Sequence, residues 1–77
     1  MKVYTWDFFG SRAEGIATHF EQHLREFLRK NGISNCETGT QSQQPGHFAA
    51  WCRSPQASEA VEKALRPKRV EDDPPRG

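Results

Sequence analysis

The sequence lacks the features that mark exported, membrane-spanning and polycationic proteins. Residues Met1 to Gly10 contain no apolar stretch followed by a small-residue cleavage site, and no apolar run approaches the roughly 20 residues that a membrane-spanning helix needs. The 11 basic and 10 acidic side chains leave a formal net charge of +1, without the positive excess typical of nucleic-acid-binding proteins. We therefore expect a cytoplasmic protein with no membrane partner, for which nucleic acid is not the first expected ligand.

Cysteine is also scarce, since the chain contains only Cys36 and Cys52. A reducing cytoplasm keeps such thiols free, and the absence of a Cys-x-x-Cys motif argues against a redox or metal loop of that type. His19 and His23 are four residues apart in a predicted helix, a spacing that can present two imidazoles to one metal ion. No His-Glu-x-x-His motif accompanies them. The sequence predicts no metal site and no cofactor.

The length of 77 residues indicates one domain, and its apolar fraction of 34% is gathered in clusters. A domain of this size buries only about 60% of the surface of its unfolded chain, so its core is thin. We predict a single folded domain over residues 1–71. The charged, proline-rich residues 72–77 are predicted to be disordered.

Residues Lys2 to Phe9 are rich in aromatic and β-branched side chains, which favours a strand. Alternation gives the strand two faces. One face carries Tyr4, Trp6 and Phe8; the other carries Val3, Thr5, Asp7 and Phe9. We assign the aromatic face to the core, because Asp7 would be costly to bury without a partner.

A long amphipathic helix is predicted from about Arg12 to Asn31. Ser11 and Glu14 have the spacing of a capping box, and Asn31-Gly32 is typical of a helix end. Apolar residues recur at helical spacing and form one stripe. The stripe contains Ala13, Ile16, Ala17, Phe20, Leu24, Phe27 and Leu28.

The second half of the chain predicts further short elements. Residues 33–41 are polar with several β-formers, which favours an edge strand, and residues 41–46 form a loop that ends in Pro45-Gly46. Residues 47–53 form an apolar strand with Phe48, Ala50 and Cys52 facing inward. Ser54-Pro55 is a predicted helix start, and residues 68–71 can form a short fourth strand.

This succession predicts an α+β domain with a ferredoxin-like βαββα(β) plan, in which two helices cover one face of a small antiparallel or mixed sheet. The two apolar strands, 2–9 and 47–53, are expected at the centre of the sheet, parallel to each other and linked by a right-handed crossover. The polar strand at 33–41 and the short basic strand at 68–71 are expected at its edges.

The face of the sheet opposite the helices is the predicted binding surface, because nothing in the sequence is assigned to cover it. Its residues are Val3, Thr5, Asp7, His47, Ala49, Trp51 and Arg53. We expect Val3, Ala49 and Trp51 to form an apolar centre there, and such patches often mark interfaces. The favoured function is a non-enzymatic interaction module that binds itself or another protein, most economically as a homodimer.

Two alternatives use the same fold. RNA-recognition domains share this topology and stack bases on aromatic residues of the first and third strands, so RNA or another single-stranded nucleic acid is one alternative ligand. A small enzyme or anion-binding protein is the other, with an anion held at Gly10, Ser11 and Arg12, where the predicted helix begins. No group of a nucleophile, a base and an orienting residue can be picked out, so no catalytic residue is predicted.

Overall fold

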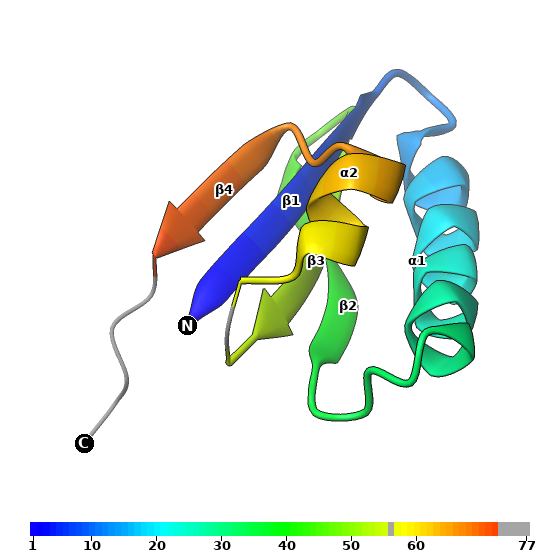
Figure 1. Cartoon of the computed structure of the whole chain (residues 1–77). Coiled ribbons are helices and arrows are strands. Elements are labelled where there is room, and N and C mark those ends of the chain that lie inside the picture. Colours follow the sequence, from blue (N-terminus) through cyan, green and yellow to red (C-terminus); the bar gives the residue numbers. More distant parts are fainter. Residues whose placement is uncertain (56, 73–77) are drawn as a thin grey trace.

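A computed structural model describes residues 1–55 and 57–72 as a small α+β fold (Figure 1). Its elements are β1 (Lys2–Phe9), α1 (Ala13–Lys30), β2 (Glu37–Gln44), β3 (His47–Ser54), α2 (Glu59–Leu65) and β4 (Arg69–Asp72). The strands form one open antiparallel sheet in the order β2-β3-β1-β4. The two apolar strands therefore occupy the centre and the two polar strands the edges, as the sequence predicts.

The predicted direction of the central strands is wrong. β1 and β3 pair antiparallel, in a register that runs from Lys2 opposite Ser54 to Phe9 opposite His47. Helix α1 connects β1 to the edge strand β2, and the turn at Pro45-Gly46 then reverses the chain so that β3 enters between them. The strand that runs parallel to β1 is thus β2, which is not its neighbour, and the crossover through α1 does not join the central pair.

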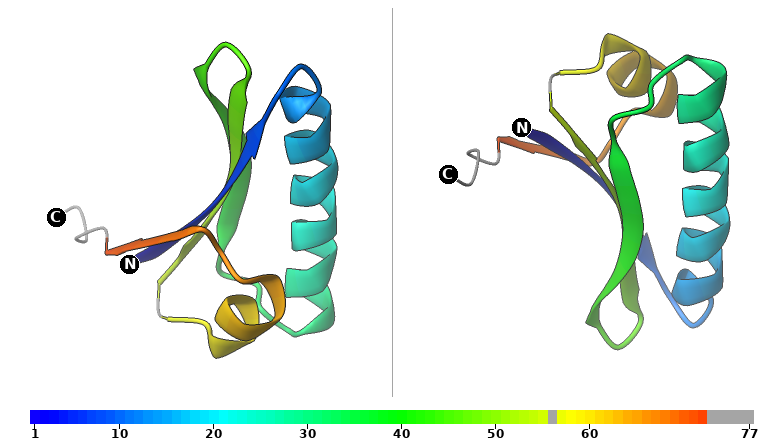
Figure 2. Two further views of the ribbon diagram at one scale, coloured as in Figure 1. Left: turned by 90° about the horizontal axis from the view of Figure 1, so that it is seen from above. Right: turned by 90° about the horizontal axis from the view of Figure 1, so that it is seen from below.

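Both helices lie over the same face of the sheet (Figure 2). The buried cluster beneath them contains Tyr4, Trp6, Leu24, Leu28, Cys52 and Val61. The Trp6 and Phe20 rings pack with their centroids 4.9 Å apart, and Phe8 contacts the same ring of Phe20 at 5.5 Å. The aromatic face of β1 is therefore the floor of the core, as its alternation predicts.

Polar groups of Tyr4 and Trp6 attach the short helix α2 to β1. The Tyr4 hydroxyl donates to Oε2 of Glu62 at 2.6 Å and accepts from the backbone N–H of Ser58 at 2.8 Å. The Nε1–H of Trp6 donates to the carbonyl oxygen of Leu65 at 2.9 Å. Burial, together with the hydrogen bond to Glu62, raises the pKa of Tyr4 to about 12, so the phenol stays protonated at neutral pH.

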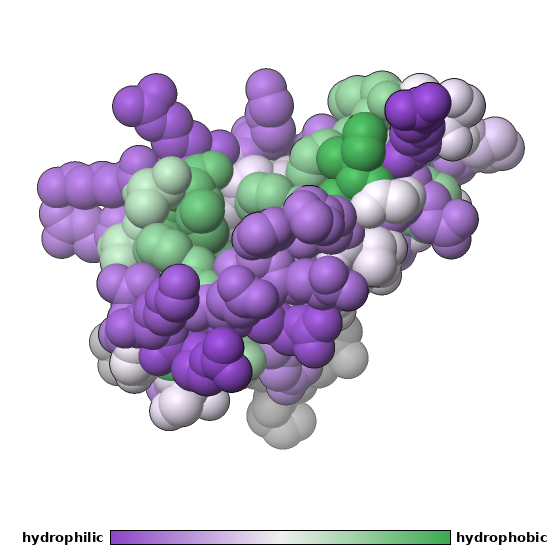
Figure 3. Space-filling view, turned by 90° about the vertical axis from the view of Figure 1, so that its right-hand side faces the viewer, coloured by the Kyte–Doolittle hydropathy of each residue, from purple (hydrophilic) through white to green (hydrophobic). Residues whose placement is uncertain are grey.

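The stripe predicted for α1 faces the sheet along most of its length, with Ala13, Ala17, Leu24 and Leu28 buried. Ile16 is 47% exposed, because the contacting side of the helix runs through Ala13 and Ala17 and leaves Ile16 at its margin. The outer side of the helix is largely hydrophilic, and its apolar areas are separated by polar side chains (Figure 3). That side of the molecule therefore offers no single continuous apolar surface.

The predicted capping box at the start of α1 is wrong. The helix begins at Ala13 after Arg12, and in the part of the chain that the structure describes no side chain caps this end. The chain instead turns sharply at Gly10, whose φ of 109° is favoured only for glycine, and the N–H of Ala13 donates to the Gly10 carbonyl at 3.2 Å. The tight turn out of β1 replaces the motif that Ser11 and Glu14 suggest.

Three other boundaries differ from the predictions. β2 begins at Glu37 and continues to Gln44, so the predicted loop shrinks to a turn. The predicted cap Ser54 is the last residue of β3, where it pairs with Lys2, and α2 is capped by Ser58, whose Oγ accepts from the N–H of Val61 at 3.3 Å. Asp72 closes β4, while residues 73–77 of the predicted disordered tail lie outside the described residues.

Within the described ranges, neither helix has the length and apolar character needed to cross a membrane.

Candidate functional site

The seven residues of the predicted binding surface lie together on the face of the sheet opposite the helices, which we call the open face. The register places Val3 opposite Arg53, Thr5 opposite Trp51, and Asp7 opposite Ala49. The edge strands add residues that the sequence did not suggest. Arg69 pairs with Thr5 and Glu71 with Val3 on one side, and Gln41 pairs with Ala49 on the other.

A shallow hollow of about 270 Å³ lies in the centre of the open face. It is lined by Val3, Thr5, Gln41, Gln43, Ala49, Trp51, Arg53, Arg69 and Glu71. Five of these nine residues belong to the predicted surface, and the other four come from β2 and β4. The hollow therefore spans all four strands, with charged and amide side chains from both edges around it.

The floor of this hollow is more closely packed than expected. Ala49 is 1% exposed and Thr5 is 6% exposed, although no helix covers them. The indole of Trp51 lies against Gly39, so close that a Cβ added at Gly39 would meet Cζ2 of the indole at 2.7 Å. The guanidinium of Arg53 lies 5.8 Å from the Trp51 ring centroid. Of the expected apolar centre, Ala49 is thus buried, while Val3 and Trp51 are half-buried and line the hollow.

A polar cluster of three residues occupies one end of the open face. Arg69 donates to both carboxylate oxygens of Asp7, at 3.1 Å from Nε and 2.9 Å from Nη2. Nε2 of His47 lies 2.9 Å from Oδ1 of the same carboxylate. Burial alone would raise the pKa of Asp7, but the hydrogen bonds from His47 and Arg69 outweigh it and hold the pKa below its ordinary value. The carboxylate is therefore an ionised acceptor that fastens β4 to β1, and it is poorly suited to accept a substrate proton at neutral pH.

Phe9 is the most exposed large apolar side chain of the described residues, and it lies beyond this cluster on β1. It is 69% exposed, and its ring stacks on His47 with the centroids 4.3 Å apart and the planes 20° apart. Strand alternation places Phe9 on the same face as Val3, Thr5 and Asp7. The sequence pattern contained this signal, yet Phe9 was not among the predicted binding residues.

The predicted anion site at Gly10, Ser11 and Arg12 forms the exposed turn between β1 and α1. The N–H of Gly10 donates to the carbonyl of Gly46 at 2.9 Å, and that of Ala13 donates to the carbonyl of Gly10 at 3.2 Å. Two of the four backbone amides from Gly10 to Ala13 are therefore already hydrogen-bonded within the protein. Fewer amides are left to bind an anion at this end of α1.

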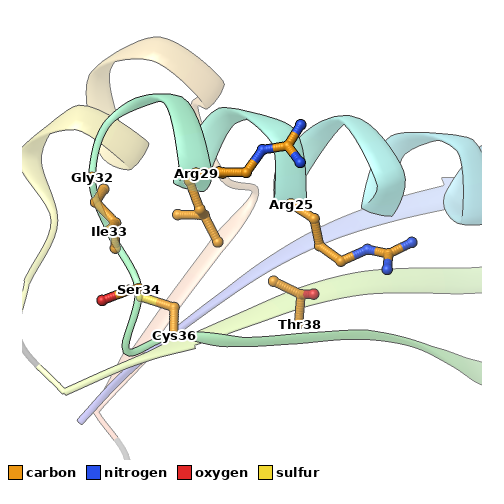
Figure 4. Close-up of a pocket in the computed structure, with 8 residues that line it drawn as sticks. Arg25, Arg29, Gly32, Ile33, Ser34, Cys36 and Thr38 are labelled. Atoms are coloured by element: carbon orange, nitrogen blue, oxygen red, sulfur yellow. The ribbon is translucent and has the colours of Figure 1, made fainter.

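A second hollow, of about 310 Å³, lies between the end of α1 and the start of β2 (Figure 4). Its lining consists of Arg25, Leu28, Arg29, Gly32, Ile33, Ser34, Cys36 and Thr38. The guanidinium groups of Arg25 and Arg29 extend away from Cys36 instead of converging on it (Figure 4). Arg25 is moreover paired with Glu21 at 3.0 Å. The hollow therefore has apolar walls but no set of convergent polar groups to orient a ligand.

Cys36 lines this hollow just before β2 and is half-buried, whereas Cys52 lies on β3 and is buried. Burial and the neighbouring Cys36 thiol raise the pKa of Cys52 to about 12. Cys52 is consequently a protonated core residue at neutral pH, not a nucleophile. Among residues 1–55 and 57–72, no group of three or more His, Cys, Asp or Glu side chains is arranged to hold a metal ion.

Comparison with known proteins found no matching family model, no matching curated protein and no matching solved structure. The geometry of this chain is therefore the basis for assigning a function to it.

Proposed function

We propose that the protein is a non-enzymatic interaction module that binds a second copy of itself through the open face. The observation that carries this proposal is the presence of a projection and a hollow on the same strand face. Phe9 is 69% exposed at one end of β1, and the hollow that includes Thr5 lies farther along the same strand. A surface that carries both can be complementary to itself.

The spacing of these two features suits a two-fold axis. Phe9 and Thr5 are four residues apart on β1, which corresponds to roughly 13 Å along a strand. An axis midway between them, near Asp7, places Phe9 of each copy over the hollow of the other. Each contact is then made twice, as a two-fold interface requires. The stacked Phe9 and His47 rings supply the kind of aromatic anchor that dominates binding energy at interfaces.

The charges of the open face also favour a second copy over nucleic acid. Strand alternation places three acidic residues (Asp7, Glu37, Glu71) and two arginines (Arg53, Arg69) on it. Two copies related by a two-fold axis can set an arginine of one against an acidic residue of the other. Phosphate binding instead benefits from an excess of positive charge, which this face does not have.

The size of the domain supports the same proposal. Within residues 1–55 and 57–72, helices cover one face of the sheet and only side chains cover the other. Burying the open face against a copy enlarges a core that one short chain can barely supply.

We infer that the module has a ferredoxin-like architecture, with its central strands antiparallel and not parallel as expected from the sequence. Its support is the element order βαββαβ together with the central position of β1 and β3. In this plan one sheet face is left free for a partner.

Analytical ultracentrifugation from about 5 µM to 0.5 mM tests the dimer, with Phe9→Ala and Ile16→Ala as a matched pair. Both side chains are large, apolar and exposed, at 69% and 47%, but Ile16 lies on α1, away from the open face. We expect a wild-type dimer, at least tenfold weaker association for Phe9→Ala, and no change for Ile16→Ala.

A wild-type mass that remains that of the monomer at 0.5 mM would contradict the proposal. So would equal weakening by both substitutions, since the contact would then not involve the open face specifically. Titration with a short oligouridine supplies the competing outcome. If it shifts the Trp51 indole resonance and binding weakens steeply with salt, the RNA alternative replaces the dimer.

A further inference from the structure

His19 and His23 lie one turn apart on the exposed side of α1, which covers the face of the sheet opposite the open face. Their Nε2 atoms are 2.9 Å apart, and their rings meet edge to face with centroids separated by 4.5 Å. Both side chains are exposed, so a hydrated ion can reach both nitrogens from solvent. We infer that this pair is a two-histidine binding site for a divalent transition metal, with Ni²⁺ and Cu²⁺ favoured over Zn²⁺.

The separation of the two nitrogens decides the preferred metal. With metal–nitrogen bonds of about 2.05 Å, nitrogens 2.9 Å apart subtend an angle of about 90° at the ion. That is the angle between neighbouring ligands in square-planar or octahedral coordination, which suits Ni²⁺ and Cu²⁺. Tetrahedral Zn²⁺ requires an angle of about 109°, or nitrogens about 3.3 Å apart. The order of intrinsic affinities, in which Cu²⁺ stands highest, acts in the same direction.

The hydrogen bond between the two rings must be exchanged for bonds to the ion. In the metal-free chain the short contact is a hydrogen bond in which one ring donates from Nε2 and the other accepts. Coordination needs the lone pairs of both Nε2 atoms, so the donor ring moves its proton to Nδ1 through solvent.

The surroundings of the pair set the strength of the site. Among the described residues no third histidine, cysteine or carboxylate joins it as a ligand group, so water completes the coordination and binding is weaker than in a closed four-ligand site. Glu26 follows His23 by three positions, which places it on the same side of the helix and brings a negative charge toward the cation. The bound ion would link two successive turns of α1 and stabilise the folded chain.

Calorimetric titration of the full chain with NiCl₂ and ZnCl₂ tests the site, with two-dimensional NMR to locate the ion. We expect one Ni²⁺ per chain, paramagnetic broadening centred on His19 and His23, and weaker binding of Zn²⁺. The variant His23→Gln should weaken Ni²⁺ binding at least tenfold. At a free Ni²⁺ concentration of 100 Kd, the melting temperature of the wild type should rise by about 10 °C or more.

A matched control keeps the number of histidines constant while removing their spacing. In His19→Gln combined with Gln22→His, two histidines remain on α1, but at neighbouring positions that face different directions. This double variant should bind Ni²⁺ as weakly as His23→Gln. Wild-type affinity in the double variant, broadening centred on His47 or the cysteines, or tighter binding of Zn²⁺ than of Ni²⁺ would each overturn the inference. None of these results depends on whether the chain dimerises.

Discussion

The residues on the two faces of β1 are buried by different parts of the molecule. On the helix face, Tyr4 and Trp6 are covered by α1 and α2, and their polar atoms are bonded to α2. On the open face, Thr5 is 6% exposed although none of the described helices or strands lies above it. Its cover comes from side chains of the neighbouring strands, including Trp51 and Arg69.

A residue's burial therefore depends on which neighbouring side chains can reach over it, and not only on the layer in which it lies. Long arginine and glutamine side chains and one flat indole shield the open face, but they leave a hollow. Helices shield the other face and, with their interlocking apolar side chains, leave a continuous core. A partner can displace or pack against the first kind of cover, whereas the second can be removed only by unfolding.

Among substitutions on the two faces of β1, Trp6→Ala is expected to change stability most. This change removes the contact with Phe20 and the hydrogen bond to Leu65 from the helix face, and should lower the free energy of unfolding by about 3–5 kcal/mol. Phe9→Ala on the opposite face should lower it by less than about 1 kcal/mol at concentrations where the chain is monomeric. Urea unfolding measures both. Similar losses from the two variants would contradict the distinction between the faces.

A second pair of substitutions tests the cover of the open face through glycine. Gly39→Ala drives a Cβ into the Trp51 indole and should destabilise the fold by about 1–3 kcal/mol, with a shift of the Trp51 indole resonance. Gly15→Ala is its control, since a Cβ added there meets no described group within 4 Å apart from its chain neighbours and the adjacent backbone of its own helix. That helical substitution should stabilise the fold by about 0.5–1 kcal/mol. A neutral effect of Gly39→Ala would mean that the indole is free to move.

Tyr4→Phe tests the polar attachment on the helix face. Loss of the hydroxyl removes bonds to Glu62 and Ser58 and should cost about 1–2 kcal/mol at neutral pH. The pKa of Tyr4 rises from 10.0 to about 12 in the folded chain, so folding favours the protonated phenol. Its contribution is complete below pH 10 and is lost as the pH rises toward 12. The stability difference between wild type and Tyr4→Phe should therefore shrink over that interval, and a constant difference would contradict this assignment.

The smallest effect is expected at the polar cluster of the open face. The Arg69 side chain is 47% exposed, so Arg69→Ala should cost no more than about 1 kcal/mol. The same change should raise the pKa of Asp7, since Arg69 is one of the two groups that hold it low. NMR titration of the Asp7 carboxylate measures this, with Lys68→Ala as a control that removes a neighbouring positive charge. Stability contributed by Asp7 should be present above its ordinary pKa of 3.8 and be lost as the pH falls through its lower folded value.

Repeating patterns in the sequence predicted the parts of the fold that depend on local periodicity. The extent of α1 was predicted to within one residue at each end, and the inward facing of Tyr4 and Trp6 follows from simple alternation. The direction of β3 was not predicted correctly. It depends on how α1 and the turn at Pro45-Gly46 carry the chain across the sheet, and no single segment encodes that path.

The start of α2 and two residues of the open face could not be predicted from local sequence patterns either. Ser54 and Ser58 are equally good capping residues, and the choice between them follows from the ladder of β3, which extends to Ser54. The predicted surface residues lie together because alternation on β1 and β3 places them so. Arg69 and Glu71 were missed because β4 has only four residues, too few to show a pattern.

The position of β1 between β3 and β4 has a consequence for the time course of folding. The backbone partners of Thr5 are Trp51 and Arg69, so β1 pairs with strands that are synthesised much later than itself. Contacts between such distant residues slow folding, because the intervening chain must first be ordered. During synthesis the apolar residues of β1 therefore remain unpaired until β3 and β4 have been made. In this interval their exposed apolar surface is most open to aggregation and to binding by chaperones.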